Sequence, residues 1–346
     1  MPSVYDLDTA ELAEHLADEP RYRVDQVWRG LWDEGLDLGD ITTVPRSLRQ
    51  RLASQFPAVI EVANDVTSDR GATRKWVFRL HDGATIETVL MNYADRVTVC
   101  ISSQAGCAMG CTFCATGQAG FTRQLSVGEV IEQVMFAARA AAPRRLSNVV
   151  FMGMGEPLAN YRVTVEVVKR LHEYKGMSAR HLTVSTVGVA PAIERLAAEG
   201  LPLTLAVSLH AANNETRNEL VPLNRRYPLE RLYEACEKWI ATTSRRLSFE
   251  WALIDGVNDT DQAIGELANF ARDLRAHVNL IPLNPTPGYL VMGSSAQRVN
   301  EFRDGLQELG INVTVRNTRG RSIDAACGQL AAVTNGHKSS VRLRSR

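Results

Sequence analysis

The alternation of short apolar segments with longer helical ones after residue 96 is the feature that most constrains the fold of this chain. The apolar segments are VTVCIS, NVVFMG, LTVSTVG, LTLAVSLH, LSFEWALI and HVNLIPLN. Helical stretches lie between them, such as the one that begins with a capping box of Ser126 and Glu129. Repeated βα units with right-handed crossovers close into a barrel, and ligands bind at the carboxyl ends of its strands. We therefore expect an α/β fold with a partial (βα)6 barrel over residues 96–335.

Two smaller regions precede the expected barrel. Residues 1–56 carry apolar side chains at helical spacing and predict a small N-terminal helical domain. Residues 57–95 change to β-branched, alternating segments separated by turns such as Asp82-Gly83, which predicts an antiparallel β extension leading into the barrel. Residues 336–346 are basic, and we expect a disordered tail there.

Charge and hydropathy argue against a membrane protein and leave a nucleic-acid partner open. The formal net charge is zero, yet residues 1–40 hold eleven acidic side chains against three arginines, a local net of −8. Residues 316–346 hold seven Lys and Arg against Asp324, a segment that could contact phosphates or be only a solvated tail. No run of eighteen apolar residues and no signal-peptide pattern occurs, so we expect a cytoplasmic protein without membrane contact.

Four of the six cysteines fall within fifteen residues, which is typical of a metal or redox site in a protein without a disulfide framework. Cys107, Cys111 and Cys114 occupy a glycine-containing loop directly after the first barrel strand. Three thiolates can hold a four-iron cluster whose remaining iron takes an external ligand. A structural zinc site would need a fourth protein ligand, and no further Cys or His lies close in sequence. The pattern favours an iron–sulfur cluster.

The spacing of these cysteines, with Phe113 before the last of them, resembles the signature of radical S-adenosylmethionine (SAM) enzymes. In that superfamily SAM chelates the open iron, and its reductive cleavage gives a 5′-deoxyadenosyl radical. The segment Gly153-Met-Gly-Glu156 is similar to the glycine–glutamate segment that contacts the SAM amino group, which implies SAM contacts by Gly155 and Glu156. The resemblance implies a radical SAM partial barrel and a [4Fe-4S] cluster.

Over residues 5–335 the chain resembles the dual-specificity adenine-C2 methyltransferases of ribosomal and transfer RNA. The segments that carry the likeness are CISSQAGCAMGCTFCATGQAGF, FMGMGEPL, VSTVGV, VSLHA, NLIPLNP and RGRSIDAACGQL. The resemblance implies 23S rRNA and tRNA as substrates, two SAM molecules per turnover, flavodoxin or ferredoxin as electron donor, and a monomer. It also implies further SAM contacts by Ser185, Ser208, Leu209, His210 and Asn284.

The same resemblance assigns three residues to the methyl transfer. Adenine carbon 2 is not nucleophilic, so a radical route is needed to methylate it. Cys327 would carry the methyl group as S-methylcysteine, Cys100 would release the product through a transient disulfide with Cys327, and Glu87 would accept the proton. From the residues alone, Glu87 reads as an outward-facing strand glutamate, and Cys100, Cys327 and Cys236 as small buried side chains. The likeness favours the catalytic interpretation for Glu87, Cys100 and Cys327 and leaves Cys236 as a structural residue.

Two alternatives remain open at this point. The related antibiotic-resistance enzymes methylate carbon 8 of adenine and share the cysteine constellation. A non-catalytic iron–sulfur protein that binds RNA or senses a signal would leave Glu87, Cys100 and Cys327 unexplained. The acidic N-terminal region is equally consistent with recognising RNA shape and with bracing the barrel.

Overall fold

The computed structural model describes residues 2–284, 292–316, 320, 323–324 and 328–330. Its centre is one curved sheet of ten strands in the order β1-β2-β3-β4-β7-β8-β9-β10-β11-β12. Six neighbouring strands run parallel in chain order and confirm the predicted partial barrel. They are β4 (Val97–Cys100), β7 (Asn148–Phe151), β8 (Leu182–Thr186), β9 (Thr204–Ser208), β10 (Leu247–Leu253) and β11 (His277–Pro282). A short seventh strand that the sequence did not predict, β12 (Val313–Val315), pairs in parallel with β11.

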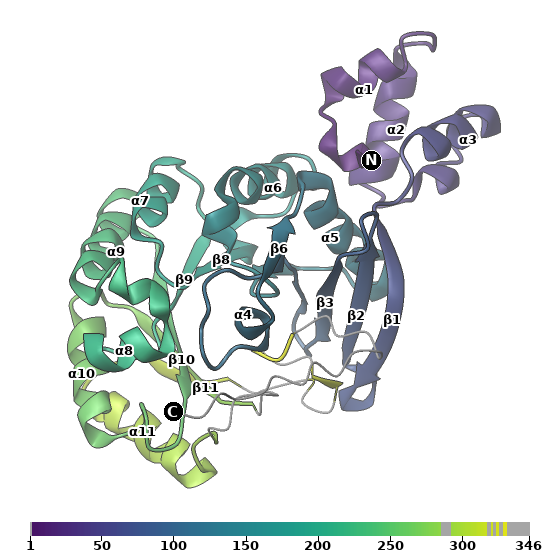
Figure 1. Ribbon diagram of the computed structural model, residues 1–346. Helices are drawn as coiled ribbons and strands as arrows, with labels where there is room; N and C mark the ends of the chain where they lie inside the picture. The colour runs from purple at the N-terminus through teal and green to yellow at the C-terminus, as the bar shows by residue number, and fades with distance from the viewer. Residues whose placement is uncertain (1, 285–291, 317–319, 321–322, 325–327, 331–346) are drawn as a thin grey trace.

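Helices cover the outer side of this curved sheet (Figure 1). They are α5 (Val127–Ala141), α6 (Tyr161–Glu173), α7 (Ala190–Ala198), α8 (Asn214–Leu220), α9 (Leu229–Thr243), α10 (Asp261–Arg272) and α11 (Ala296–Glu308). The predicted capping box begins α5: Glu129 N donates to Ser126 Oγ, and Ser126 N donates to the Glu129 carboxylate. Among the described residues no helix has the length and apolar character needed to cross a membrane.

The antiparallel extension continues the wall of the barrel. It consists of β1 (Ile60–Ser68), β2 (Thr73–Leu80) and β3 (Thr85–Asn92), and β3 pairs with barrel strand β4. The register aligns Lys75 of β2 with Val89 of β3, Cys100 of β4 and Val150 of β7. Paired residues on adjacent strands share a face, and Val150 lines a cavity inside the barrel. Lys75, Cys100 and Glu87, which lies two residues from Val89, therefore lie on the inner face.

The N-terminal helices α1 (Thr9–His15), α2 (Tyr22–Trp32) and α3 (Arg46–Gln55) stand apart from the barrel, near the ends of β1–β3 (Figure 1). Residues of this N-terminal region contact α6 and the residue that follows it. Arg170 donates from its guanidinium to the carbonyls of Tyr5 and Leu7, at 2.8 and 2.9 Å. The Trp32 ring meets the Tyr174 ring edge to face at 5.3 Å.

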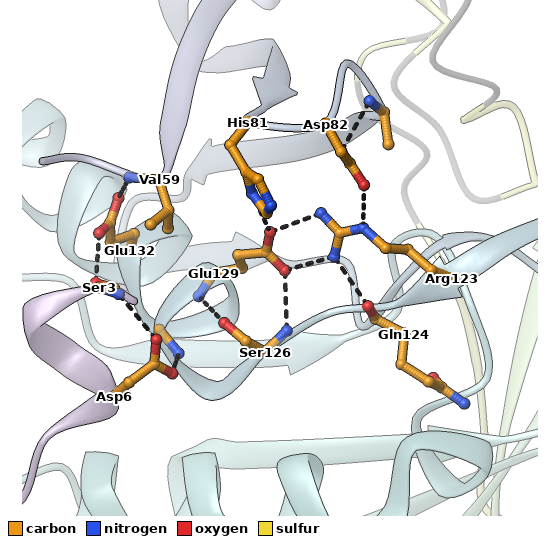
Figure 2. Close-up of polar contacts among 12 residues, drawn as sticks. Ser3, Asp6, Val59, His81, Asp82, Arg123, Gln124, Ser126, Glu129 and Glu132 are labelled. Carbon is orange, nitrogen blue, oxygen red and sulfur yellow. Dashed lines mark hydrogen bonds and ion pairs between the residues drawn. The ribbon is translucent and has the colours of Figure 1, made fainter. Parts of the chain in front are cut away.

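A second set of polar contacts joins the N-terminus to α5 (Figure 2). Ser3 Oγ and Val59 N both donate to the buried carboxyl of Glu132, and Gly128 N donates to Asp6 Oδ1. Asp6 thus accepts a hydrogen bond from the N-terminal turn of α5, where backbone N–H groups lack helical partners.

Candidate active site

A pocket opens at the carboxyl ends of the parallel strands, where the sequence placed the functional residues. The predicted site residues that line it are Cys111, Cys114, Gly155, Glu156, Ser185, Ser208 and His210. Cys107 belongs to the same loop but does not line the pocket. The leucine side chain of Leu209 packs in the hydrophobic core, and Asn284 is buried beyond the end of β11, so neither lines the pocket.

The cysteine loop lies between a small hairpin and a short helix. The hairpin strands are β5 (Gln104–Gly106) and β6 (Phe121–Gln124), and the helix is α4 (Ala115–Ala119). Gly106 has φ +76°, and an added Cβ would lie 2.0 Å from the Gly120 carbonyl oxygen, so only glycine fits where the hairpin strands converge. Cys107 N donates to that same carbonyl at 2.8 Å. These contacts fix where the loop leaves and rejoins the barrel.

The three thiols fit the corners of a cluster better than a single ion. Cys107 and Cys114 each act electrostatically on Cys111, so the three lie near one another. Burial raises the pKa of Cys107 to about 12 and that of Cys111 well above its ordinary value, so a cationic group is needed to hold these two side chains as thiolates. In the described part of the chain no three His, Cys, Asp or Glu side chains are placed to hold one metal ion. A four-iron cluster takes its thiolates at separate iron atoms.

Arg123 anchors the hairpin that carries the loop (Figure 2). Its Nε lies 2.5 Å from Asp82 Oδ2 in the β2–β3 turn, and its terminal nitrogens lie 2.8 and 2.7 Å from the Glu129 carboxylate oxygens on α5. The guanidinium therefore ties β6 to both the extension and the first barrel helix.

Glu156 is held as an acceptor directly after β7. Its two carboxyl oxygens accept hydrogen bonds from Leu158 N at 3.0 Å and Val187 N at 2.8 Å. Burial raises its pKa to about 7. An added Cβ on Gly153 would lie 2.6 Å from the Ile101 carbonyl oxygen, so the glycine lets this segment pack against the strand end before the cysteine loop.

His210 stays neutral and joins the cysteine loop to β9 and β10. Burial lowers its pKa to about 3. Its Nδ1 accepts a hydrogen bond from Ala252 N at 3.0 Å, which leaves the proton of the neutral ring on Nε2. The ring meets Phe113 of the cysteine loop edge to face at 4.6 Å. Ser185 Oγ donates to the Phe151 carbonyl and so links the ends of β8 and β7.

A second constellation lies on the inner face of the extension. Glu87 is only 3 % exposed, so its interpretation as an outward-facing strand residue was wrong. The Lys75 ammonium lies 3.2 Å from Glu87 Oε2, and both side chains are buried. Alternation alone could not find Lys75, because a lysine in a strand reads as solvent-facing unless the strand is known to continue the barrel wall.

Cys327 itself lies outside the described residues, but described residues on both sides of it are anchored. On one side, Lys75 Nζ donates to the Asp324 carbonyl at 3.2 Å and Gly320 N donates to Asp69 Oδ2 at 3.0 Å. On the other side, Ala115 N donates to the Gly328 carbonyl at 2.8 Å. Ala115 directly follows Cys114 of the cysteine loop. Asp324 thus lies beside the Glu87–Lys75 pair, and Gly328 lies beside the cysteine loop.

Comparison with known proteins identifies the class. Residues 101–271 match the model of the radical SAM superfamily. The chain is 49% identical to the crystal structure of a radical SAM methyltransferase from Sphaerobacter thermophilus, with a TM-score of 0.93 over 96% of this chain and 100% of that one. This protein is a radical SAM enzyme, which excludes the non-catalytic alternative.

Curated relatives identify the family. A "Probable dual-specificity RNA methyltransferase RlmN" from Salinispora tropica is 50% identical over 91% of this chain and 88% of its own length. The protein of that name from Chloroflexus aurantiacus is 47% identical over 95% of this chain and 92% of its own length. The chain belongs to the RlmN family of radical SAM RNA methyltransferases. That family implies a [4Fe-4S] cluster and SAM.

Proposed function

We propose that the protein methylates carbon 2 of a specific adenine in 23S rRNA and in tRNA, and that Cys327 carries the methyl group to the base. The observation that carries the proposal is the anchoring of the segment around Cys327. Lys75 holds Asp324 beside Glu87, while Ala115 holds Gly328 beside the cysteine loop. A methyl group on residue 327 would then lie between a radical source and a base.

Cys107, Cys111 and Cys114 would hold the cluster, with Glu156, Ser185, Ser208 and His210 forming the SAM pocket. The cluster with its bound SAM supplies one-electron cleavage of SAM and, through it, the removal of a hydrogen atom. Leu209 and Asn284 would serve through their backbone or through packing, since neither side chain lines the pocket. We propose two SAM molecules per turnover, flavodoxin or ferredoxin as electron donor, and a monomer.

The inner-face residues would complete the reaction. The Cys327 sulfur accepts a methyl group from one SAM and loses its thiol proton. After the methyl carbon has bonded to adenine carbon 2, Glu87 takes the proton from adenine carbon 2. Cys100, as a thiolate, then attacks Cys327 Sγ, so that a disulfide forms as the bond between the Cys327 sulfur and the product carbon breaks; that carbon takes up a proton to become the product methyl group, and the unpaired electron left by the radical addition passes back to the one-electron carrier. Cys100 is buried on the same face as Glu87, which supports this role. A dithiol reductant restores both thiols.

Nucleoside mass spectrometry tests the proposal. Anaerobically reconstituted protein with SAM and a reductant should convert the target adenosine of 23S rRNA to 2-methyladenosine. Formation of 8-methyladenosine would assign the chain to the carbon-8 enzymes instead, and no methylation by a protein with an intact cluster would refute both. The Cys327→Ala variant is the matched control, because it should still cleave SAM without methylating RNA.

A further inference from the structure

A second cavity of about 700 Å³ lies at the opposite end of the barrel from the SAM pocket. Its walls come from the first residues of the parallel strands. They include Thr98, Asn148, Thr183, Thr204, Ser248 and His277. Met152, Glu250 and Arg316 line this lower cavity and the SAM pocket alike, so the two spaces meet inside the barrel.

Glu250 of β10 lies where the two spaces meet. It is 4 % exposed, and the strand register aligns it with Ser208 of β9 and Asn279 of β11. Its Oε1 accepts hydrogen bonds from Asn279 Nδ2 at 2.9 Å and Ser248 Oγ at 3.2 Å. Its Oε2 is buried, and no described residue donates a hydrogen bond to it. A buried carboxyl oxygen without a donor costs free energy, which a ligand N–H or O–H group would recover.

The residues around Glu250 indicate the chemical class of the ligand that would donate to Oε2. Ser248 and Asn279, which hold the other oxygen, line the lower cavity and not the SAM pocket, so the carboxyl group is fixed from the lower side. Arg246 also lines the lower cavity. So do Arg96 and Tyr93, and the Arg96 guanidinium lies 4.2 Å from the centre of the Tyr93 ring. Arginine and aromatic side chains together suit the phosphates and bases of unstacked RNA.

The lower cavity also lies next to the proposed methyl-transfer residues. Thr98 and Val150 line it, and the register places Cys100 two residues after Thr98 and opposite Val150. A base in this cavity would be bordered by the Cys100 face on one side and by Glu250 on the other.

We propose that the lower cavity receives the target adenosine of the RNA and that Glu250 Oε2 accepts a hydrogen bond from the adenine 6-amino group. Glu250 is then the residue that distinguishes adenine from bases without an amino group at that position. The inference rests on the proposed function, since it takes an RNA adenosine as the substrate.

Exchange of the base tests the contact without changing the protein. RNA hairpins would carry either adenosine or purine riboside, which lacks the 6-amino group, at the target position. We expect the wild-type kcat/KM for methylation to fall 10- to 100-fold with purine riboside. Equal rates on the two RNAs would overturn the proposal, whereas failure to methylate the adenosine RNA would overturn the proposed function itself.

The Glu250→Gln variant separates recognition of the amino group from the intrinsic reactivity of the two bases. It should lose 10- to 100-fold on the adenosine RNA and show little further loss on the purine riboside RNA. Glu237→Gln, the same exchange at an exposed position of α9 outside both cavities, is the matched control and should discriminate as the wild type does. Undiminished discrimination by Glu250→Gln would overturn the proposal. A raised KM for SAM in RNA-free SAM cleavage, with discrimination unchanged, would assign Glu250 to the SAM pocket.

Discussion

The Lys75 ammonium contacts groups from two distant parts of the chain, the Glu87 carboxyl and the Asp324 carbonyl. Both members of the Lys75–Glu87 pair are buried, at 10% and 4% side-chain exposure. Breaking a buried pair by removing one partner leaves the other charge uncompensated and costs about 3–5 kcal/mol. We therefore infer that Lys75 is a positioning residue: it holds the carboxyl group of Glu87, the proposed proton acceptor, and the backbone at Asp324.

Lys75→Met should slow product formation at least tenfold, because Glu87, the proposed proton acceptor, loses the ammonium group that holds its carboxylate in place. The covalent protein–RNA species should accumulate, which denaturing gels with labelled RNA would measure. Lys75→Arg keeps the positive charge and should restore most of the rate. Release of free methylated RNA by Lys75→Met at the wild-type rate would contradict this role.

Cys100→Ala should arrest turnover after the carbon–carbon bond has formed, because no thiol remains to displace the product from Cys327. RNA should stay covalently attached to the protein, as mass spectrometry of the RNase-digested complex would show. Cys236→Ala is a suitable control, since Cys236 is fully buried on α9 and we expect it to be structural. Clean product release by Cys100→Ala would remove Cys100 from the mechanism.

At the scale of elements, a strand or helix is predicted best where its own residue pattern is enough to identify it. The six parallel strands were visible because each is a short, mainly apolar run separated from the next by a longer helical stretch. β12 was missed because three residues carry too little pattern. The sequence did not show that the extension continues the barrel wall, and so Glu87 taken alone read as an outward-facing residue. The resemblance pointed to Leu209, yet only the structure shows its side chain in the core.

Arg123 ties the hairpin of the cysteine loop to α5 and to the β2–β3 turn. Arg123→Met leaves the buried Glu129 carboxylate without its charged partner, and we expect a loss of about 2 kcal/mol in the free energy of unfolding. Iron content per chain should also fall, because the hairpin holds both ends of the cysteine loop. Arg74→Met, which breaks a half-exposed ion pair with Asp65, is the control. Unchanged iron content in Arg123→Met would show that the loop does not depend on this contact.

The docking of the N-terminus on α5 should depend on pH through Glu132. Burial raises its pKa from the ordinary value of 4.5 to about 7, so the folded state binds the proton more tightly than the unfolded state does. The stabilisation is complete below the unfolded pKa and is lost as pH rises through the folded pKa, by about 3 kcal/mol at most. Urea unfolding of the apo chain between pH 5 and 8 should show this decline. Glu132→Gln should make the decline shallower and leave the part that comes from Glu156, whose pKa burial also raises to about 7, and an unchanged slope in that variant would exclude Glu132 as a source.

At the scale of the whole molecule, the N-terminal helices and the barrel share one hydrophobic core. Trp32 is 1% exposed and contacts the rings of Tyr5, Trp28 and Tyr174. Trp32→Ala should lower the free energy of unfolding by about 3–5 kcal/mol. The loss should appear in the unfolding of the barrel, followed by far-ultraviolet circular dichroism, and not only in an early transition of the N-terminal helices. A barrel that unfolds at unchanged denaturant concentration would show that the two parts are energetically independent.

The extension β1–β3 and the parallel strands are two parts of one sheet, and we propose that each part has its own task in the reaction. The residues that would generate the radical follow the parallel strands, whereas Lys75 and Glu87, which we propose direct its use, stand on antiparallel strands added at one edge. Protein engineering could exploit this division. Exchanging only the inner-face side chains of β2 and β3, with Asp82 of the turn kept as the partner of Arg123, would leave the radical-generating half intact, and a single scaffold could be redirected to new substrates one edge at a time.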